Sequence, residues 1–466
     1  DDIQMEFGLD KCAKSSFKKG KLTTTENIQI DEETTIQELE QDKSYKYLGI
    51  DEGDGISHSQ MKEKLRKEYY RRIRLVLRSE LNAKNKIAAI NSLAIPVIEY
   101  SFGIVNWKIE EIKRIDAKTR KLLTMHHQYH PKADVERLYI SRRDGGRGLK
   151  QLETTFKTTI IGLAVYIETK EDTLITKVKK HEGAKPKYSI SKQAAKYRQE
   201  LSVNPTNNEE KPANERARKT KQEAKAKAQQ ALKKTWEEKP MHGQYPAETN
   251  RAYVDKERSF QWLQSAGLKG ETEGFITAAQ DQALNTKYYQ NKISKTTEDP
   301  KCRLCHEYNE TVEHITSGCP ILARTEYIQR HNRIASYIHW HCCKEYNMGT
   351  TEKWYDHTPQ MVTSKDHITL LWDMPIQTDR TLSANKPDIV IKDRKNQKCT
   401  LIDVAVPSDR NIAIKENEKK LKYKDLEIEV TKMWNLKTIT LPIIIGSTGL
   451  IKINMQENVN QLPGNP

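Results

Sequence analysis

Two aspartates near the C-terminal end of the sequence have the spacing of opposed residues on a β-hairpin. The flanking pattern predicts apolar strands at 387–391 and 399–406 and a polar turn centred on Lys395 and Asn396. That turn pairs Asp388 with Asp403 across the hairpin, where opposed Cβ atoms lie roughly 4.5–5.5 Å apart. Two carboxylates so close repel each other unless a divalent cation neutralises them. The spacing therefore predicts a metal site.

The alternative is an aspartate pair that is satisfied by surface salt bridges beside a solvated lysine face. Asp403, however, stands between Ile402 and Val404 in what the pattern predicts to be a central strand. A carboxylate without a partner is costly in such a place. The position of Asp403 therefore favours the metal site over the surface pair.

A helix predicted at 413–434 follows the hairpin and carries lysines that bear on the same chemistry. Lys415, Lys419 and Lys422 are three and four residues apart, so they share one face of that helix. A lysine beside a metal-bound water can orient the attacking hydroxide or stabilise charge on a phosphorane. A final apolar strand at 438–445 is expected to complete a small sheet with the helix packed on one face.

Three of the seven cysteines cluster with a histidine upstream of the hairpin, in the pattern Cys302-x2-Cys305-x8-His314-x4-Cys319. A close pair of cysteines can point both thiolates at one ion, and three thiolates with one imidazole predict a structural Zn(II) site. The alternatives are ordinary core cysteines without a metal, and His306 or His331 in place of His314. A second group, His339-Trp340-His341-Cys342-Cys343, lacks paired spacing, and we expect core or helix-end residues there.

The 466-residue chain has a formal charge of +15, which fits a polyanionic partner such as DNA or RNA; a generic solvated surface is the alternative. Its seven cysteines are too few for a disulfide scaffold and indicate a reducing compartment. No apolar run approaches the roughly 18–20 residues that span a bilayer. The start at Asp1 has no signal-peptide pattern. Because the first residue is not methionine, we expect a piece of a longer reading frame.

At this length we expect a multidomain α+β protein. Residues 1–50 predict short strands and turns, and residues 51–169 predict a basic helical bundle whose second helix is interrupted at Pro96. Residues 170–240 are rich in Lys, Ala, Gln and Glu, which predicts a solvated or partly helical basic linker or, alternatively, a basic arm along a phosphate backbone. Residues 241–350 predict helices around the zinc knuckle, and residues 351–466 a small mixed α/β domain.

The hairpin and its helix resemble a known nuclease family. Pro387-Asp388, then Asp403 after fourteen intervening residues, then Lys419-x2-Lys422-Tyr423 is similar to the restriction-like endonuclease of site-specific non-LTR (LINE-type) retrotransposons, in the PD-(D/E)xK nuclease superfamily. The usual superfamily lysine lies two residues beyond the second acid, where this chain has Ala405; in the retrotransposon branch it lies on the following helix. The resemblance implies that Asp388 and Asp403 bind Mg(II) or Mn(II), and that Lys422, with Lys419 second, serves the attacking water.

The resemblance covers nearly the whole chain and is weakest at 170–240. The cysteine knuckle matches the family's order of modules. Glu6-Phe7-Gly8-Leu9-Asp10-Lys11-Cys12 and Tyr47-Leu48-Gly49 look like the end of a reverse-transcriptase palm, and the helices of 51–169 look like its thumb. The polymerase motif, an aromatic and a small residue before two aspartates, is absent, because Asp1-Asp2 lies too close to the Phe7 phrase. We therefore expect no polymerase activity from this sequence.

The family, by resemblance, nicks target DNA and primes reverse transcription from the exposed 3′-hydroxyl. This implies target DNA and element RNA as partners, a nuclear location and no membrane. Two other classes stay open: a non-catalytic nucleic-acid-binding protein, as a decayed or repurposed element, and a zinc-organised protein-interaction scaffold. The first binds nucleic acid with a steep salt dependence and does not nick it, whereas the second shows little salt-sensitive binding.

Overall fold

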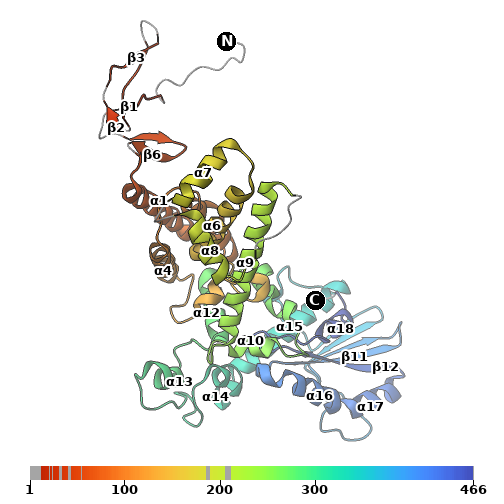
Figure 1. Cartoon of the computed structure of the whole chain (residues 1–466). Helices are drawn as coiled ribbons and strands as arrows, with labels where there is room; N and C mark the ends of the chain where they lie inside the picture. The colour runs from red at the N-terminus through yellow and green to blue at the C-terminus, as the bar shows by residue number, and fades with distance from the viewer. Residues whose placement is uncertain are drawn as a thin grey trace. The chain divides into compact units, whose positions relative to one another are not determined.

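The computed structural model describes residues 12–19, 21–23, 25–30, 34–39, 44–53, 55–184, 189–204 and 211–464. It is a mixed α/β structure whose contacts divide it into two compact units (Figure 1). The first comprises Asp1–Leu81, Asn85–His126 and Gly148–Ala231, and the second Asn82–Lys84, His127–Arg147 and Leu232–Pro466. The five-part division expected from the sequence stays a prediction. None of the described helices is both long and apolar enough to span a membrane.

The first unit begins with short antiparallel strands. They are β1 (Ser16–Lys18) with β2 (Lys21–Thr23), β3 (Ile28–Gln29) with β4 (Thr35–Ile36), and the set β5 (Tyr45–Tyr47), β6 (Ile50–Gly53) and β7 (Gly55–Ile56). The short strands and turns expected in this region include a turn between β5 and β6, with φ of 48° at Leu48 and 85° at Gly49. Asp1-Asp2 and the phrase at 6–11 lie outside the described residues.

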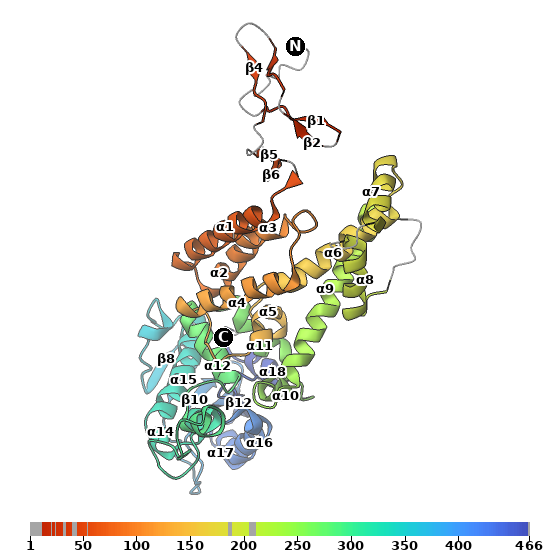
Figure 2. The ribbon, with the colours of Figure 1, turned by 60° about the vertical axis from the view of Figure 1, so that its left-hand side comes forward.

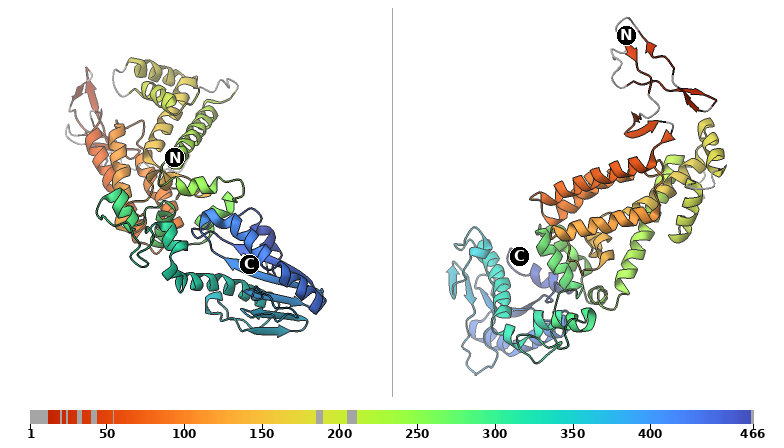
Figure 3. Two further views of the ribbon diagram at one scale, coloured as in Figure 1. Left: turned by 90° about the horizontal axis from the view of Figure 1, so that it is seen from below. Right: turned by 90° about the vertical axis from the view of Figure 1, so that its left-hand side faces the viewer.

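Helices form the rest of the first unit, because apolar residues recur there with helical spacing. They are α1 (His58–Arg78), α2 (Ala83–Ala89), α3 (Ile95–Glu99), α4 (Ile109–Met125), α6 (Leu152–Thr169), α7 (Thr173–Ala184), α8 (Ile190–Glu200) and α9 (Ala213–Glu237); the unit boundary passes through α2 and α9. α1 runs beside α4 (Figure 3), and α6 beside α8 and α9 (Figure 2). Their core contains the buried Tyr69, Ile73, Ile98 and Leu123.

The helix at Pro96 differs from the expectation that this proline interrupts it. Pro96 occupies the first turn of α3, where no backbone N–H is needed, so the ring is tolerated. A π-helical turn at Ile90–Ala94 joins α2 directly to α3. The linker expected at 170–240 is largely helical, and the small residues Thr220, Ala224 and Ala228 of α9 are buried along one face of that helix.

The second unit is built around a five-stranded sheet in the order β12-β11-β10-β9-β8. The strands are β8 (Val362–Lys365), β9 (Ile368–Trp372), β10 (Ile389–Asp393), β11 (Lys398–Ala405) and β12 (Lys437–Ile444). β8 to β11 pair antiparallel, and β12 is parallel to β11. This parallel pair needs a crossover connection, which α16 (Ile412–Lys422) and α17 (Lys424–Trp434) supply.

Helices cover both faces of this sheet (Figure 1). α15 (Glu326–Glu345) and α18 (Met455–Asn460) pack on one face, against a core that includes Ile389 and Ile402. α17 packs on the other face, against a core that includes Val390 and Leu401. The remaining helices of the unit are α5 (Val135–Tyr139), α10 (Gln244–Thr249), α11 (Lys256–Ser265), α12 (Gly270–Gln280), α13 (Lys287–Tyr289) and α14 (Pro320–Ala323).

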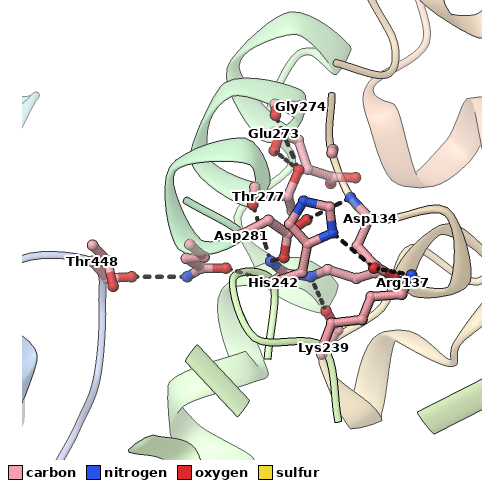
Figure 4. A network of polar contacts seen from close by, with 12 residues as sticks. Asp134, Arg137, Lys239, His242, Glu273, Gly274, Thr277, Asp281 and Thr448 are labelled. Atoms are coloured by element: carbon pink, nitrogen blue, oxygen red, sulfur yellow. Dashed lines mark hydrogen bonds and ion pairs between the residues drawn. The ribbon is translucent and has the colours of Figure 1, made fainter. Parts of the chain in front are cut away.

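A buried polar network holds the helical part of this unit together (Figure 4). Arg137 of α5 donates from Nη1 to Asp281 Oδ1 at 2.8 Å and from Nη2 to the side-chain oxygen of Gln280. Gln280 Nε2 in turn donates to the carbonyl of Thr448, in the loop after β12, at 2.8 Å. Arg137 and Asp281 are almost fully buried, so each charge depends on the other for its partner.

Candidate functional site

The hairpin register predicted from the sequence is confirmed. Ile389 pairs with Ile402 and Val390 with Leu401, so the register continued by one residue sets Asp388 opposite Asp403. Side chains alternate between the faces of a strand, which puts both aspartates on the face covered by α17. Asp403 is only 2% exposed, and Asp388, just before β10, is partly exposed.

Asp403 is held by two groups from the crossover helices. Lys419 Nζ of α16 lies 2.5 Å from Asp403 Oδ2. Tyr423, between α16 and α17, has its hydroxyl 2.8 Å from Asp403 Oδ1 and 2.9 Å from the carbonyl of Lys386. Burial and the negative charge of Asp403 raise the pKa of Tyr423, so the phenol keeps its proton at neutral pH. The buried carboxylate thus has one cationic and one neutral partner.

The lysines are arranged differently from the sequence prediction, which put Lys422 first and Lys419 second. Lys419 is the lysine that contacts the carboxylate, whereas Lys422 Nζ contacts the Tyr423 hydroxyl at 2.8 Å. Lys415 is paired with Glu418 at 2.5 Å. The single helix predicted at 413–434 is two helices that meet at Tyr423. The break between the helices explains why Lys422 does not contact the carboxylate, because Lys422 is the last residue of α16.

Asp388 has partners from the strand opposite and from α15. Its Oδ2 accepts a 2.7 Å hydrogen bond from the backbone N–H of Val404. His331 Nε2 lies 3.1 Å from the same oxygen and 3.1 Å from the carbonyl oxygen of Val404. The hydrogen bond to Asp388 raises the pKa of His331 to about 9, although burial opposes it. His331 therefore carries a positive charge at neutral pH.

The donors at this place suit a hard cation. Mg(II) and Mn(II) prefer carboxylate and carbonyl oxygens, and Asp388, Asp403 and the Val404 carbonyl supply them. The chain already sets two positive nitrogens, of His331 and Lys419, against these oxygens. Among the described residues none donates a hydrogen bond to Asp388 Oδ1. Asp388 and Asp403 are therefore the residues here that could hold a divalent cation.

The predicted zinc ligands come together. One donor atom each from Cys302, Cys305, His314 and Cys319 lies within 4.8 Å of the others, and these groups could hold a structural metal such as zinc. Cys305 Sγ is 3.4 Å from His314 Nε2, close to the separation of about 3.6 Å between S and N ligands of tetrahedral zinc. Backbone N–H groups, first that of Tyr308, lower the pKa of the Cys305 thiol despite burial, which favours the thiolate.

The alternatives for the imidazole ligand do not join this cluster. His306 is outside the group of converging donor atoms, and His331 contacts Asp388. Pro320, directly after the last ligand, is the first residue of α14. His314–Gly318 forms a π-helical turn, and a Cβ at Gly318 would lie 3.6 Å from His314 Nδ1.

α15 connects the knuckle to the two aspartates. The Tyr327 hydroxyl accepts from the N–H of Cys319 at 3.1 Å and contacts the carbonyl of Ile315 at 2.7 Å. Arg330 donates to the carbonyls of Thr316 at 2.8 Å and Val406 at 3.4 Å. The next residue is His331, the partner of Asp388. One helix therefore contacts both predicted metal sites within five residues.

An open groove lies beside these groups. It has a volume of about 550 Å³ and runs between the knuckle, the end of β11 and α16. His314 and Gly318 line one side, and Lys415 lines another. The strand side begins at Ala405, two residues beyond Asp403. The groove thus borders the strand end that carries the buried aspartate.

No protein-family model matches this chain, and a search of the curated proteins finds no match. The chemistry of the site therefore has to be argued from its residues.

Three site features were not found from the sequence. The sequence indicates His331 only as a substitute zinc ligand and Tyr423 only as part of a motif, and it gives no sign of the Val404 carbonyl. For Tyr423 a signal existed, because a large aromatic residue stands between Lys422 and Lys424. For His331 no local signal existed, since its position depends on how α15 packs on the sheet.

Proposed function

We propose that the second unit is a metal-dependent DNA endonuclease that nicks target DNA, in a protein of the non-LTR retrotransposon reverse transcriptase/endonuclease type. The observation that carries the proposal is the buried Asp403, opposite Asp388, with Lys419 at 2.5 Å from its Oδ2. Two acids and a lysine at one strand end are the groups that phosphodiester hydrolysis with a divalent cation uses.

Asp388 and Asp403 are the residues that would hold Mg(II) or Mn(II). Such an ion, when bound, polarises the phosphate and lowers the pKa of a water molecule. Side chains of the protein stabilise charge and position Asp403. Lys419 neutralises Asp403 and sets a cation beside the reacting phosphate, where it stabilises developing negative charge. Tyr423 fixes the orientation of Asp403 through Oδ1, and Lys422 acts through Tyr423, so both are positioning residues.

DNA as the substrate is supported by charge and by space. The chain has a formal charge of +15, and neutralising phosphates releases counterions, which drives binding. The groove is lined by Ala405, two residues beyond Asp403 in β11, and gives room for one strand. By the family resemblance, the nick leaves a 3′-hydroxyl that primes copying of element RNA in the nucleus.

The test is nicking of supercoiled plasmid by the full chain. We expect conversion to open circles in Mg(II), none in EDTA, and its loss in Asp388→Ala and Asp403→Ala. Asp425→Ala is the control, because Asp425 on α17 is exposed and pairs with the exposed Arg380 at 3.5 Å. Salt-sensitive DNA binding without nicking would instead favour the non-catalytic binding protein. Equal nicking by wild type and both variants would rule the proposed centre out.

A further inference from the structure

A second group of metal-ligand side chains lies apart from the knuckle and from the two aspartates. His339 and Cys343 are one helical turn apart on α15. His357 follows the short helix η6 (Trp354–Asp356), in the connection from α15 to β8. One donor atom from each lies within 4.8 Å of the other two. The sequence predicted core or helix-end residues at 339–343, and His339 and Cys343 are each 1% exposed. No local pattern in the sequence indicated that they contact His357.

The separations are close to those that a zinc ion imposes. His339 Nδ1 lies 2.9 Å from His357 Nε2 and 3.5 Å from Cys343 Sγ. Around tetrahedral zinc, two nitrogen ligands are about 3.3 Å apart, and a nitrogen and a sulfur about 3.6 Å apart. The two rings would have to separate by only about 0.4 Å to admit the ion.

The same three groups have a metal-free arrangement as well. In it the two imidazoles share one proton at 2.9 Å, and Cys343 contributes a weakly hydrogen-bonding thiol. This arrangement leaves the Cys343 sulfur, a strong zinc ligand, with only a weak hydrogen bond. The core around it, which includes Ala335 and Ile338, is otherwise apolar. A zinc ion uses all three donors at once.

We propose that His339, Cys343 and His357 bind a Zn(II) ion, separately from the zinc knuckle. The ion ties the connection at 346–361 to α15, next to the edge strand β8. Weaker contacts already hold this connection: Ser336 Oγ donates to the carbonyl of His357 at 3.3 Å, and the ring centres of Tyr337 and Trp354 are 5.5 Å apart. His357 is partly exposed, so the ion has a route in. The fourth ligand position is free for water or an external ligand.

The experiment counts zinc in the purified full chain by mass spectrometry of the metal. We expect two ions per chain in wild type, and one in His357→Asn, Cys343→Ser and the knuckle variant Cys305→Ser. The matched controls are His341→Asn and Cys342→Ser. His341 and Cys342 are neighbours on α15 outside the cluster, and Cys342 is as buried as Cys343, so a loss through misfolding would appear in these controls as well.

Cobalt gives a second readout, which reports the kind of ligand and not only the number of ions. Co(II) added to metal-free Cys305→Ser is expected to give the absorption of a thiolate-bound tetrahedral ion, which Cys343→Ser removes and Cys342→Ser keeps. The proposal is overturned if wild type holds one zinc ion and His357→Asn holds the same, or if Co(II) in Cys305→Ser shows no thiolate band. It does not depend on the proposed nuclease, because neither readout involves DNA.

Discussion

Lys419 Nζ lies 2.5 Å from Oδ2 of the buried Asp403, across the junction of α16 and β11. A carboxylate that is 2% exposed needs a compensating charge, and this contact supplies it in the absence of a metal. The contact also places Lys419 at the end of β11 that carries Asp403. The same pair thus stabilises the fold and carries the proposed chemistry.

Lys419, which contacts the carboxylate of Asp403, is expected to contribute more to the nicking rate than Lys422, which the sequence prediction put first. Lys419→Ala removes the direct charge, and we predict a roughly 10–100-fold slower nicking rate. Lys422→Ala acts only through Tyr423, and its loss is expected to stay under about tenfold. Lys420→Ala is the control, since Lys420 pairs with Glu416 at 2.8 Å. Single-turnover rates that fall equally in Lys419→Ala and Lys420→Ala would contradict this order.

Removal of one hydroxyl tests the positioning of Asp403. Tyr423→Phe keeps the buried ring but deletes the hydrogen bond to Oδ1. We predict about tenfold slower nicking, a higher Mg(II) concentration for half-maximal rate, and a loss of about 1 kcal/mol in the free energy of unfolding. If the hydroxyl were only structural, unfolding would change while the Mg(II) dependence of the rate stayed as in wild type.

Loss of zinc from the knuckle is expected to affect the proposed nuclease centre through α15. Cys305→Ser should lower the melting temperature and also slow nicking at saturating Mg(II), because Arg330 links Thr316 of the knuckle to Val406 beside His331. Cys399→Ser is the control, as Cys399 is buried in β11 and lies outside both groups of converging ligands. A nicking rate that is unchanged in folded Cys305→Ser would show that the knuckle and the centre are independent.

The polar network of Figure 4 predicts a pH-dependent stability. Burial opposes ionisation of Asp134, but hydrogen bonds from His242 and Lys239 lower the pKa of its carboxyl to about 2. Since the folded pKa is below the unfolded value of 3.8, the ionised group contributes about 2 kcal/mol above pH 4, which is lost as pH falls toward 2. Asp134→Asn should therefore destabilise at pH 6 and about half as much at pH 3. Urea denaturation measures this loss. An equal loss in the free energy of unfolding at pH 6 and pH 3 would contradict the lowered pKa of Asp134.

Local signals were enough for the parts of the site that lie close together in the sequence. The register of Asp388 and Asp403 followed from one polar turn and two apolar strands, and the knuckle ligands followed from their spacing. The break at Tyr423 did not, because α16 and α17 together have the pattern of one amphipathic helix. It depends on a hydroxyl that bonds Asp403, a contact twenty residues away.

The histidines were beyond sequence reasoning for a related reason. His331 meets Asp388 over 57 positions of sequence, and His339 meets His357 over 18. Both contacts exist because α15 packs on the face of the sheet opposite α17. The sequence predicted helices at 241–350, but it does not say which residues of such a helix contact another element.

The most direct test of the proposed centre is the single-turnover nicking rate of Asp403→Asn in Mg(II). The substitution keeps the size of the side chain and its contact with Tyr423 but removes the charge that faces Lys419 and the cation. We predict at least a 100-fold slower rate than wild type, with DNA affinity within the range of the Asp425→Ala control. A rate for folded Asp403→Asn equal to that of wild type would contradict the account.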